Sequence, residues 1–310
     1  MTDLRVAFFG SPAFALPSLE TLSQNHNLVL VVSQPDKPAG RGLTKRPPPV
    51  ADWASKNSVP LLQPTTLRTN SEFRDNLRKA NLDVAVTVAY GKLLPEDLLQ
   101  IPRYGFLNAH ASLLPSYRGA APIQWALING ETTTGVSIMS TEIGLDTGPI
   151  RLTKSISIGP GATATDLFIK LADVSAETLN IALANLAEGN LPSCAQDHDQ
   201  ATLAPLLTRD DGKIYWNRPA QEIYNRYRGV HNWPGSWCLF MDTILKIERM
   251  RLSDKNGPPG QILAITKSGI IIGTGSGAIC LERLKPEGKT TMSASDWCNG
   301  YDVRKGEFFA

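Results

Sequence analysis

The sequence predicts an α/β protein in which a Rossmann-like domain precedes a small β-barrel domain of OB type. Nearly continuous apolar runs such as 28–32 and 83–90 alternate with helix-forming stretches, which is typical of a parallel sheet covered on both faces. After residue 207 the pattern changes to short β-rich segments between turn residues, which favours a small closed barrel. We therefore expect a first domain over 1–189, a linker over 190–207 and a second domain over 208–310.

Length and composition support two soluble, cytoplasmic domains. The chain has 310 residues, of which 42% are hydrophobic and 19% charged, so it is long enough for two cores and unlike a disordered protein. No apolar run is long enough to span a membrane, and the N-terminus has no signal peptide. The four cysteines are far apart and form no C-x-x-C motif, so we expect reduced thiols and no metal.

Charge is divided unevenly along the chain. Residues 1–207 carry 16 Lys+Arg and 18 Asp+Glu, whereas residues 208–310 carry 15 and 11. The net charges are therefore −2 and +4. A mildly basic second domain is consistent with a polyanionic partner without requiring one.

The first domain begins with an apolar strand that ends at Gly10 and leads into a Ser-Pro helix start. A G-x-G-x-x-G motif is absent from this turn, which disfavours a dinucleotide site. By the same apolar runs and breaker residues, the expected strands are 4–10, 28–32, 59–62, 83–90, 106–107, 134–139 and 150–158. The expected helices are 11–23, 50–57, 71–80, 122–129 and 165–188.

The segment 35–49 combines five prolines and two glycines with four basic residues. Proline and glycine oppose regular structure, so we expect a surface loop with no strand or helix interior. The loop is either a solvated connection or a basic arm that orders on a phosphate backbone. Its basic residues are Lys37, Arg41, Lys45 and Arg46.

The stretch 104–122 carries the strongest chemical signal. Asn108 and His110 are two residues apart at the end of an apolar run, so on a strand their side chains share one face. Asp146 follows later in a glycine-flanked Gly-Leu-Asp-Thr-Gly loop. Together the three would supply an oxyanion donor, an acid/base group and a charge. Alternatively, the histidine is structural and the asparagine is a turn residue.

In the second domain the expected strands are 213–216, 237–240, 244–251, 260–266, 269–274 and 278–284, interrupted by one helix at 220–228. Basic side chains recur on these strands and turns, and they either follow phosphates or cover a solvated face. They are Lys246, Arg249, Arg251, Lys285 and Lys289.

The run N-A-H-A-S-L-L-P-S-Y-R-G-A-A-P over 108–122, with L-D-T-G downstream, resembles the 10-formyltetrahydrofolate-dependent formyltransferases. The resemblance covers nearly the whole chain. It implies transfer of the formyl group of 10-formyltetrahydrofolate to the α-amino group of methionyl initiator tRNA, a step of translation initiation. It also implies Asn108, His110 and Asp146 as catalytic residues and a second domain that binds tRNA.

The resemblance further implies where folate and tRNA bind. The residues expected at the folate are Phe14, Tyr90, Leu93, Ser112, Leu113, Leu114 and Pro115. Those expected at the tRNA are Lys37, Arg41, Lys45 and Arg46, of which Arg41 fits the family pattern best. We expect a monomer.

Three alternatives share part of these features. An N-formyltransferase acting on a small amine or amino sugar keeps the catalytic core but needs neither the basic loop nor the barrel. A formyltetrahydrofolate hydrolase uses water as the acceptor. A non-catalytic tRNA-binding protein would keep the fold without turnover.

Overall fold

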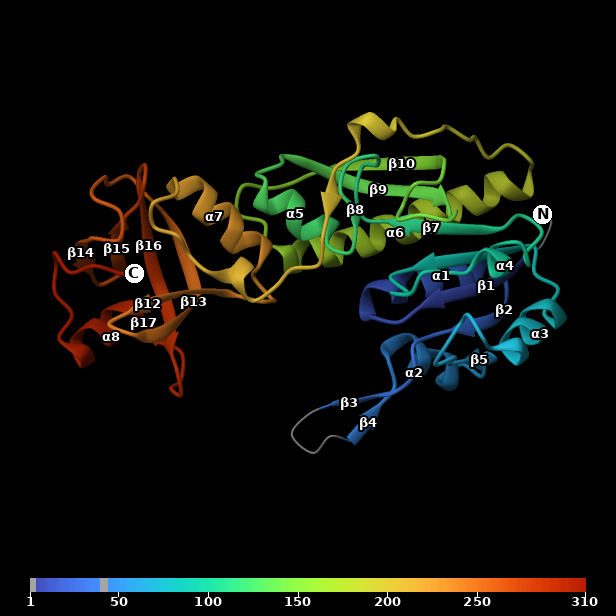
Figure 1. Cartoon of the computed structure of the whole chain (residues 1–310), viewed down its shortest axis with the longest axis horizontal. Coiled ribbons are helices and arrows are strands. Elements are labelled where there is room, and N and C mark those ends of the chain that lie inside the picture. Colours follow the sequence, from blue (N-terminus) through green and yellow to red (C-terminus); the bar gives the residue numbers. More distant parts are fainter. Residues whose placement is uncertain (1–3, 40–43) are drawn as a thin grey trace. The chain divides into compact units, whose positions relative to one another are not determined.

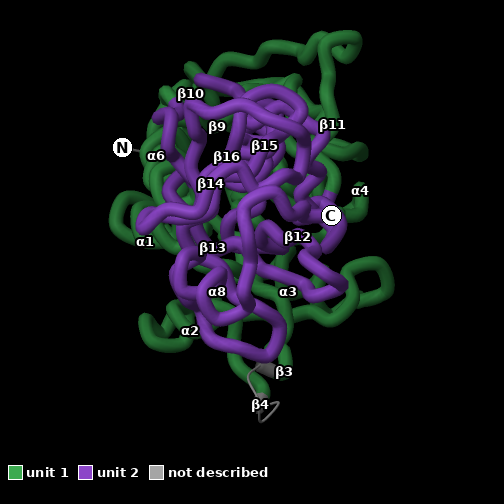
Figure 2. The backbone as a smooth tube through the Cα atoms, turned by 90° about the vertical axis from the view of Figure 1, so that its left-hand side faces the viewer, with its two compact units in different colours: residues 1–122, 133–157, 168–205 green, residues 123–132, 158–167, 206–310 purple. Residues whose placement is uncertain are grey.

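The chain, described by a computed structural model over residues 4–39 and 44–310, contains two compact units (Figure 1). The units are distinguished by colour in Figure 2. Unit 1 comprises residues 1–122, 133–157 and 168–205, and unit 2 comprises residues 123–132, 158–167 and 206–310. Most of the expected linker, up to residue 205, therefore makes its contacts within unit 1.

Unit 1 is built on a seven-stranded sheet with the order β10-β9-β7-β6-β1-β2-β5. The strands are β1 (Arg5–Gly10), β2 (Asn27–Val32), β5 (Leu61–Leu62), β6 (Val84–Val88), β7 (Phe106–His110), β9 (Thr133–Ser140) and β10 (Ile150–Ser157). The five strands from β7 to β5 are parallel, whereas β9 is antiparallel to both β7 and β10. This confirms the predicted Rossmann-like sheet.

The centre of this sheet is apolar on both faces. Every residue of β6 is buried, as is all of β1 except Arg5, which explains why both read as continuous apolar runs. On one face the ring of Phe9 makes edge contacts with the rings of Phe73, Tyr90 and Phe106, with centroids 6.4, 5.4 and 5.2 Å apart. These contacts join strands β1 and β7 and the loop after β6 to a helix.

Helices connect the strands, five of them where the sequence predicts and α4 in addition. They are α1 (Leu16–Asn25), preceded by a 3₁₀ turn η1 (Ala13–Ala15), α2 (Pro49–Lys56), α3 (Ser71–Lys79), α4 (Glu96–Leu99), α5 (Pro122–Ile128) and α6 (Ala164–Ala187). The side chain of Asn70 caps α3 by accepting a hydrogen bond from the Phe73 N–H at 2.9 Å. In α6, Phe168 meets Phe14 edge-on at 5.9 Å, so α6 packs beside the start of the first helix.

The basic segment after β2 departs from the prediction. Strands β3 (Lys37–Ala39) and β4 (Thr44–Arg46) form an antiparallel ribbon where a loop without strands was expected. A proline is tolerated here because both members of a two-stranded ribbon are edge strands, which leave half of their backbone groups outside the ladder.

Two shorter strands complete unit 1. β8 (Arg118–Gly119) pairs in parallel with β11 (Leu203–Ala204). A 3₁₀ turn, η2 (His198–Gln200), precedes β11. The segment predicted as a linker thus runs along the loop that follows β7.

Unit 2 contains an antiparallel sheet with the order β12-β13-β16-β15-β14, and β17 pairs with β16. Its strands are β12 (Ser236–Phe240), β13 (Thr243–Ser253), β14 (Ile262–Thr266), β15 (Gly269–Gly273), β16 (Ala278–Pro286) and β17 (Met292–Ser293). Residues 306–310 bridge the two outer strands: Ile262 N–H donates to the Glu307 carbonyl at 2.8 Å and Ala310 N–H to the Leu239 carbonyl at 3.0 Å. The sheet is therefore closed by the last residues rather than by strand pairing.

Unit 2 also contains η3 (Asp210–Gly212), α7 (Ala220–Gly229) and α8 (Ala294–Tyr301), together with most of α5 and the first residues of α6. The expectation of a single helix was wrong, since α8 is a second one. The expected strand 213–216 was also wrong: Ile214 and Trp216 are buried, which accounts for the alternating pattern, but only Lys213 forms a bridge, to Trp237.

Candidate active site

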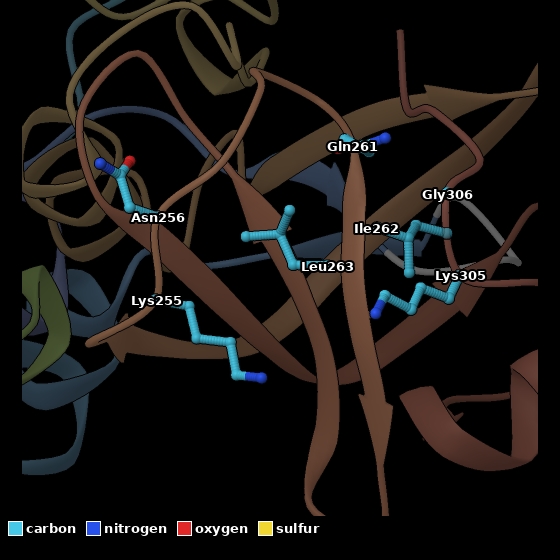
Figure 3. A pocket seen from close by; sticks show the side chains of 7 residues that line it. All are labelled: Lys255, Asn256, Gln261, Ile262, Leu263, Lys305 and Gly306. Carbon is cyan, nitrogen blue, oxygen red and sulfur yellow. The ribbon is translucent and has the colours of Figure 1, made fainter.

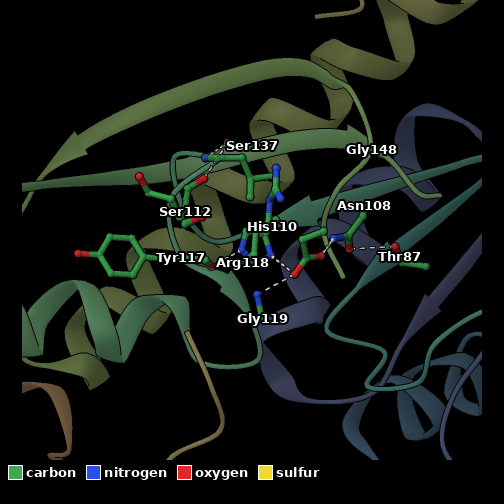
Figure 4. Close-up of polar contacts among 12 residues, drawn as sticks. Thr87, Asn108, His110, Ser112, Tyr117, Arg118, Gly119, Ser137 and Gly148 are labelled. Carbon is green, nitrogen blue, oxygen red and sulfur yellow. Dashed lines mark hydrogen bonds and ion pairs between the residues drawn. The ribbon is translucent and has the colours of Figure 1, made fainter. Parts of the chain in front are cut away.

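Strand β7 presents Asn108 and His110 on one face of the sheet, as their spacing predicts (Figure 4). β7 lies between β6 and β9, with Asn108 opposite Thr87 on one side and Met139 on the other. His110 is 6% exposed. Both side chains are therefore held by a strand whose two neighbours fix its position.

Asp146 reaches this face from the loop between β9 and β10. The base of the loop is closed by a hydrogen bond from the Ser140 N–H to the Pro149 carbonyl at 3.0 Å. Gly148 permits a tight return, because a Cβ there would lie 1.9 Å from the Ser140 carbonyl oxygen. Asp146 has a φ of +53°, a left-handed conformation that aspartate tolerates better than most residues.

The structure brings the three predicted catalytic side chains together. Asp146 Oδ2 lies 3.5 Å from His110 Nδ1, and Asp146 Oδ1 lies 3.5 Å from Asn108 Nδ2. The shortest contact of the carboxylate is to the backbone, since Gly119 N–H donates to Oδ2 at 2.9 Å. One carboxylate thus faces an amide, an imidazole and a main-chain donor.

The ring of His110 is fixed from its other side. His110 Nε2 lies 2.9 Å from the carbonyl oxygen of Tyr117. A carbonyl only accepts hydrogen bonds, so Nε2 carries the hydrogen of this bond and Nδ1 faces Asp146. This contact is shorter than the one to Asp146, so the backbone carbonyl and not the carboxylate sets the tautomer.

The carboxamide of Asn108 is also oriented. Thr87 Oγ1 donates to Asn108 Oδ1 at 2.9 Å. The oxygen of the amide is therefore turned toward β6, and its nitrogen toward Asp146. An amide nitrogen has two N–H donors, and this arrangement aims that group at the space beside the carboxylate.

The loop 112–116 after β7 is held by buried hydroxyl groups. Ser137 Oγ accepts a hydrogen bond from Leu114 N–H at 3.0 Å and donates to the Ser112 carbonyl at 2.8 Å. Ser112 Oγ donates to the Ser116 carbonyl at 2.6 Å. Four of the predicted folate residues, 112–115, therefore lie on a loop whose shape is fixed by β9.

The other three predicted folate residues lie in different surroundings. Phe14 is half-buried against Phe168, and Tyr90 is 4% exposed within the aromatic core around Phe9. Burial raises the pKa of the Tyr90 hydroxyl to about 12. Leu93, by contrast, is 75% exposed. The ring of Tyr90 is accounted for by the core, whereas Leu93 offers an apolar side chain to a ligand.

The predicted tRNA-binding residues lie on the β3–β4 ribbon, except Arg41, which lies outside the described residues. Lys37 is paired opposite Arg46, and both side chains are exposed, as is that of Lys45. Opposite residues of an antiparallel pair share a face, so the Lys37 and Arg46 charges lie together. The pKa of Lys92 is lowered first by burial and then by the charge of Lys37.

The sequence did not single out four groups that shape the site. They are the hydroxyl of Thr87, the carbonyl of Tyr117, the N–H of Gly119 and the side chain of Gln196, which donates to the Asp146 carbonyl at 2.9 Å. Two of these are main-chain groups without a side-chain signature. Gln196 was hidden in a stretch that read as a linker.

The described residues contain no cluster of three or more His, Cys, Asp and Glu side chains that could hold a metal. Within 4–39 and 44–310, no helix is both long and apolar enough to cross a membrane. A surface pocket of about 350 Å³ in unit 2 includes exposed Lys255 and Lys305 in its lining, but none of the predicted site residues (Figure 3).

The fold and the site define a class of protein. The formyl transferase family pattern matches residues 4–183, and the pattern described as formyl transferase, C-terminal domain, matches residues 206–302. The chain therefore belongs to the formyl transferase family.

Its relatives point to one branch of that family. The chain is 48% identical to the methionyl-tRNA formyltransferase of Deinococcus radiodurans, over 98% of this chain and 95% of the relative. It is 45% identical to the methionyl-tRNA formyltransferase of Thermus thermophilus, over 98% of each chain.

Solved structures share the fold at much lower identity. The N-formyltransferase of Helicobacter canadensis aligns with a TM-score of 0.68 and 16% identity, over 90% of this chain and 98% of that one. HypX of Aquifex aeolicus, in complex with tetrahydrofolic acid, aligns with a TM-score of 0.63 and 13% identity, over 100% of this chain and 51% of that one.

Proposed function

We propose that the chain transfers the formyl group of 10-formyltetrahydrofolate to the α-amino group of methionyl initiator tRNA. The observation that carries the proposal is near-full-length similarity to methionyl-tRNA formyltransferases, with the Asn108, His110 and Asp146 side chains gathered at one point. The sugar-amine alternative is less favoured. The N-formyltransferase of Helicobacter canadensis, solved in complex with folinic acid and dTDP-3-aminofucose, is similar in fold but only 16% identical to this chain.

The transfer forms a bond from the amine to the formyl carbon, breaks the bond from that carbon to N10, and moves a proton from the amine to N10. The bound donor supplies a formyl carbon that is already an electrophile. Negative charge develops on the formyl oxygen, and the Asn108 amide N–H is placed to donate to it. Asp146 accepts the proton that the amine releases on its way to N10. His110 Nδ1 faces this carboxylate.

The surroundings of the site suit the flat rings of a folate. The loop 112–115 presents a fixed edge beside β7, and Phe14 is half-buried near the start of α1. Large apolar side chains are exposed after β6 and on the Asp146 loop, namely Leu93 at 75%, Ile143 at 68% and Leu145 at 51%. Such side chains supply the contact area of a ligand site.

Binding of tRNA is assigned to two places. The β3–β4 ribbon carries the Lys37, Lys45 and Arg46 charges on exposed side chains, and residues 208–310 carry the net positive charge of the chain. The division into a catalytic region 1–189, a linker 190–207 and a tRNA-binding region 208–310 is part of this proposal. A monomeric state and a cytoplasmic location are also predictions.

The test is to mix the purified chain with 10-formyltetrahydrofolate and charged initiator or elongator methionine tRNA. We expect N-blocked methionine on the initiator tRNA and little on the elongator. Formate release without any amine would favour the hydrolase. Formylation of an amino sugar in preference to the tRNA, or salt-dependent tRNA binding without turnover, would reject the proposal.

A further inference from the structure

A buried glutamine joins the loop of Asp146 to Arg118. Gln196 Nε2 donates to the Asp146 carbonyl at 2.9 Å and to the Gly148 carbonyl at 2.6 Å. Its Oε1 accepts from Arg118 Nη2 at 2.6 Å and from Arg118 Nε at 3.1 Å. Both side chains belong to the buried set, each 7% exposed.

The partners of this glutamine fix its orientation. The guanidinium of Arg118 only donates hydrogen bonds and the two carbonyls only accept them, so the amide oxygen must face Arg118. Both N–H groups and both lone pairs of the Gln196 amide are then in use. A buried amide with every hydrogen bond formed holds its neighbours in one arrangement, because each alternative leaves a buried group without a partner.

The backbone around Gln196 is tied to the same two loops. Cys194 and Ile150 exchange hydrogen bonds of 2.8 and 2.9 Å, just after the Asp146 loop. Further along, Arg118 N–H donates to the Thr202 carbonyl at 2.8 Å. The segment 194–204 thus fastens the loop that carries Asp146 to the strand β8 that carries the Gly119 N–H.

The hydrogen bonds of Gln196 help to fix the position of the Asp146 carboxylate. Asp146 has a positive φ, and residues 142–145 before it are exposed, so its own loop offers it little packing. The carboxylate accepts a hydrogen bond from Gly119 N–H at 2.9 Å. Gln196 links the backbone of Asp146 to the side chain of Arg118, the residue before Gly119. Loss of the two Gln196 N–H donors would free the loop without touching the three reacting side chains.

We propose that Gln196 is a positioning residue that acts through Asp146, by holding its carboxylate within reach of Asn108 and His110. The inference rests on the proposed function, in which Asp146 takes part in formyl transfer. A displacement of about 1 Å at a reacting group lowers turnover by up to about a hundredfold.

The experiment compares the full chain with Gln196→Met and Gln196→Glu. Methionine keeps the length but removes all four hydrogen bonds. Glutamate keeps the size of the side chain and can still accept from Arg118, but it replaces the two N–H donors by an oxygen that faces the Asp146 and Gly148 carbonyls. Gln200→Met is the matched control, because Gln200 is exposed on the same segment and bonds to Asp197.

Both Gln196 variants should lower kcat by about ten- to a hundredfold while the KM for the folate and for the tRNA changes less than about twofold. Gln200→Met should leave both unchanged. In an Asp146→Asn background, adding Gln196→Glu should lower kcat further by less than about twofold. Gln196 acts only through the Asp146 carboxylate, so the effects of the two substitutions should not add. Amide hydrogen exchange over residues 141–149 should become faster in both variants.

Unchanged kcat in both variants, or a full additional loss in the Asp146→Asn background, would overturn the role of Gln196. If the wild-type chain forms no N-formylmethionyl-tRNA, the proposed function fails on its own. Hydrogen exchange still decides in that case, because unchanged exchange over 141–149 in Gln196→Glu would reject the positioning role without any turnover.

Discussion

The hydroxyl of Thr87 donates to Asn108 Oδ1 at 2.9 Å across the pairing of β6 with β7. The two ends of a carboxamide are nearly equal in shape, and only their hydrogen bonds distinguish them. This contact therefore decides that the nitrogen of Asn108, and not its oxygen, faces the reacting group.

Replacing Thr87 by valine should lower kcat by about three- to tenfold. Valine keeps the shape but removes the hydroxyl, and a hydrogen bond contributes about 1 kcal/mol net, which corresponds to that range of rates. Steady-state formyl transfer measures the effect. Thr153→Val, at an exposed position on β10 of the same sheet, is the control and should be neutral. Equal kcat for the two variants would contradict the orienting role.

The three gathered side chains should each be needed for turnover. We expect Asn108→Ala to lower kcat by about 10²–10³, the usual loss for one oxyanion donor. His110→Ala and Asp146→Asn should lower it by about 10²–10⁴, the range for a positioned acid or base. Single-turnover assays with bound substrates measure this step. Near-wild-type rates in all three would show that the cluster is structural.

The positive charges of the β3–β4 ribbon should affect the binding of tRNA and not that of folate. Lys37→Ala and Arg46→Ala should each raise the KM for the tRNA and reduce the slope of log affinity against log salt by about 0.7–0.9, because one phosphate contact is lost. Arg41→Ala should behave in the same way. The KM for the folate should not move.

Lys79→Ala is the control for this series, because it removes one exposed positive charge from α3. A change of tRNA affinity in the control as large as in the ribbon variants would mean that only net charge matters.

Tyr90 should make the protein less stable as the pH rises from 10 to 12. Its pKa is 10.0 in ordinary surroundings and is raised to about 12 by burial, so in that window the unfolded chain loses the proton first. The free energy of unfolding should therefore fall by about 2–3 kcal/mol across the window. Urea unfolding at several pH values measures the slope.

Tyr90→Phe tests the same point and should remove this part of the slope. At pH 7 it should be neutral or slightly stabilising, because the buried Tyr90 hydroxyl has no partner among the described residues. An unchanged alkaline slope in the variant would assign the effect to other groups.

Cys194 should react faster with a thiol reagent than the other three cysteines. Cys194 is exposed, whereas Cys238, Cys280 and Cys298 are buried. Burial raises the pKa of all three buried thiols, that of Cys298 to about 11. At pH 8 we expect one fast reaction with a thiol reagent in the native protein and four in denaturant, with the fast phase absent in Cys194→Ser. Two or more fast native thiols would contradict the burial.

By itself, the sequence determined the order of the seven strands of the main sheet and of the five longer helices in the first domain, because apolar runs and breaker residues are local signals. It did not predict the short elements β3, β4, β8, β11 and α4. It also placed Asn108 and His110 on one face, since strand periodicity alone requires it. The family motif in the sequence pointed to Asp146. Asp146 is 38 residues from Asn108 in the chain, and this spacing does not determine how close the two side chains lie.

Only the tertiary structure decided how the site is held. Thr87 and Gln196 act through side chains that lie far from the motif in the chain, and Tyr117 and Gly119 through main-chain groups that any residue carries. A hydrogen bond between distant segments depends on how the segments pack, and local sequence patterns carry no information about that packing.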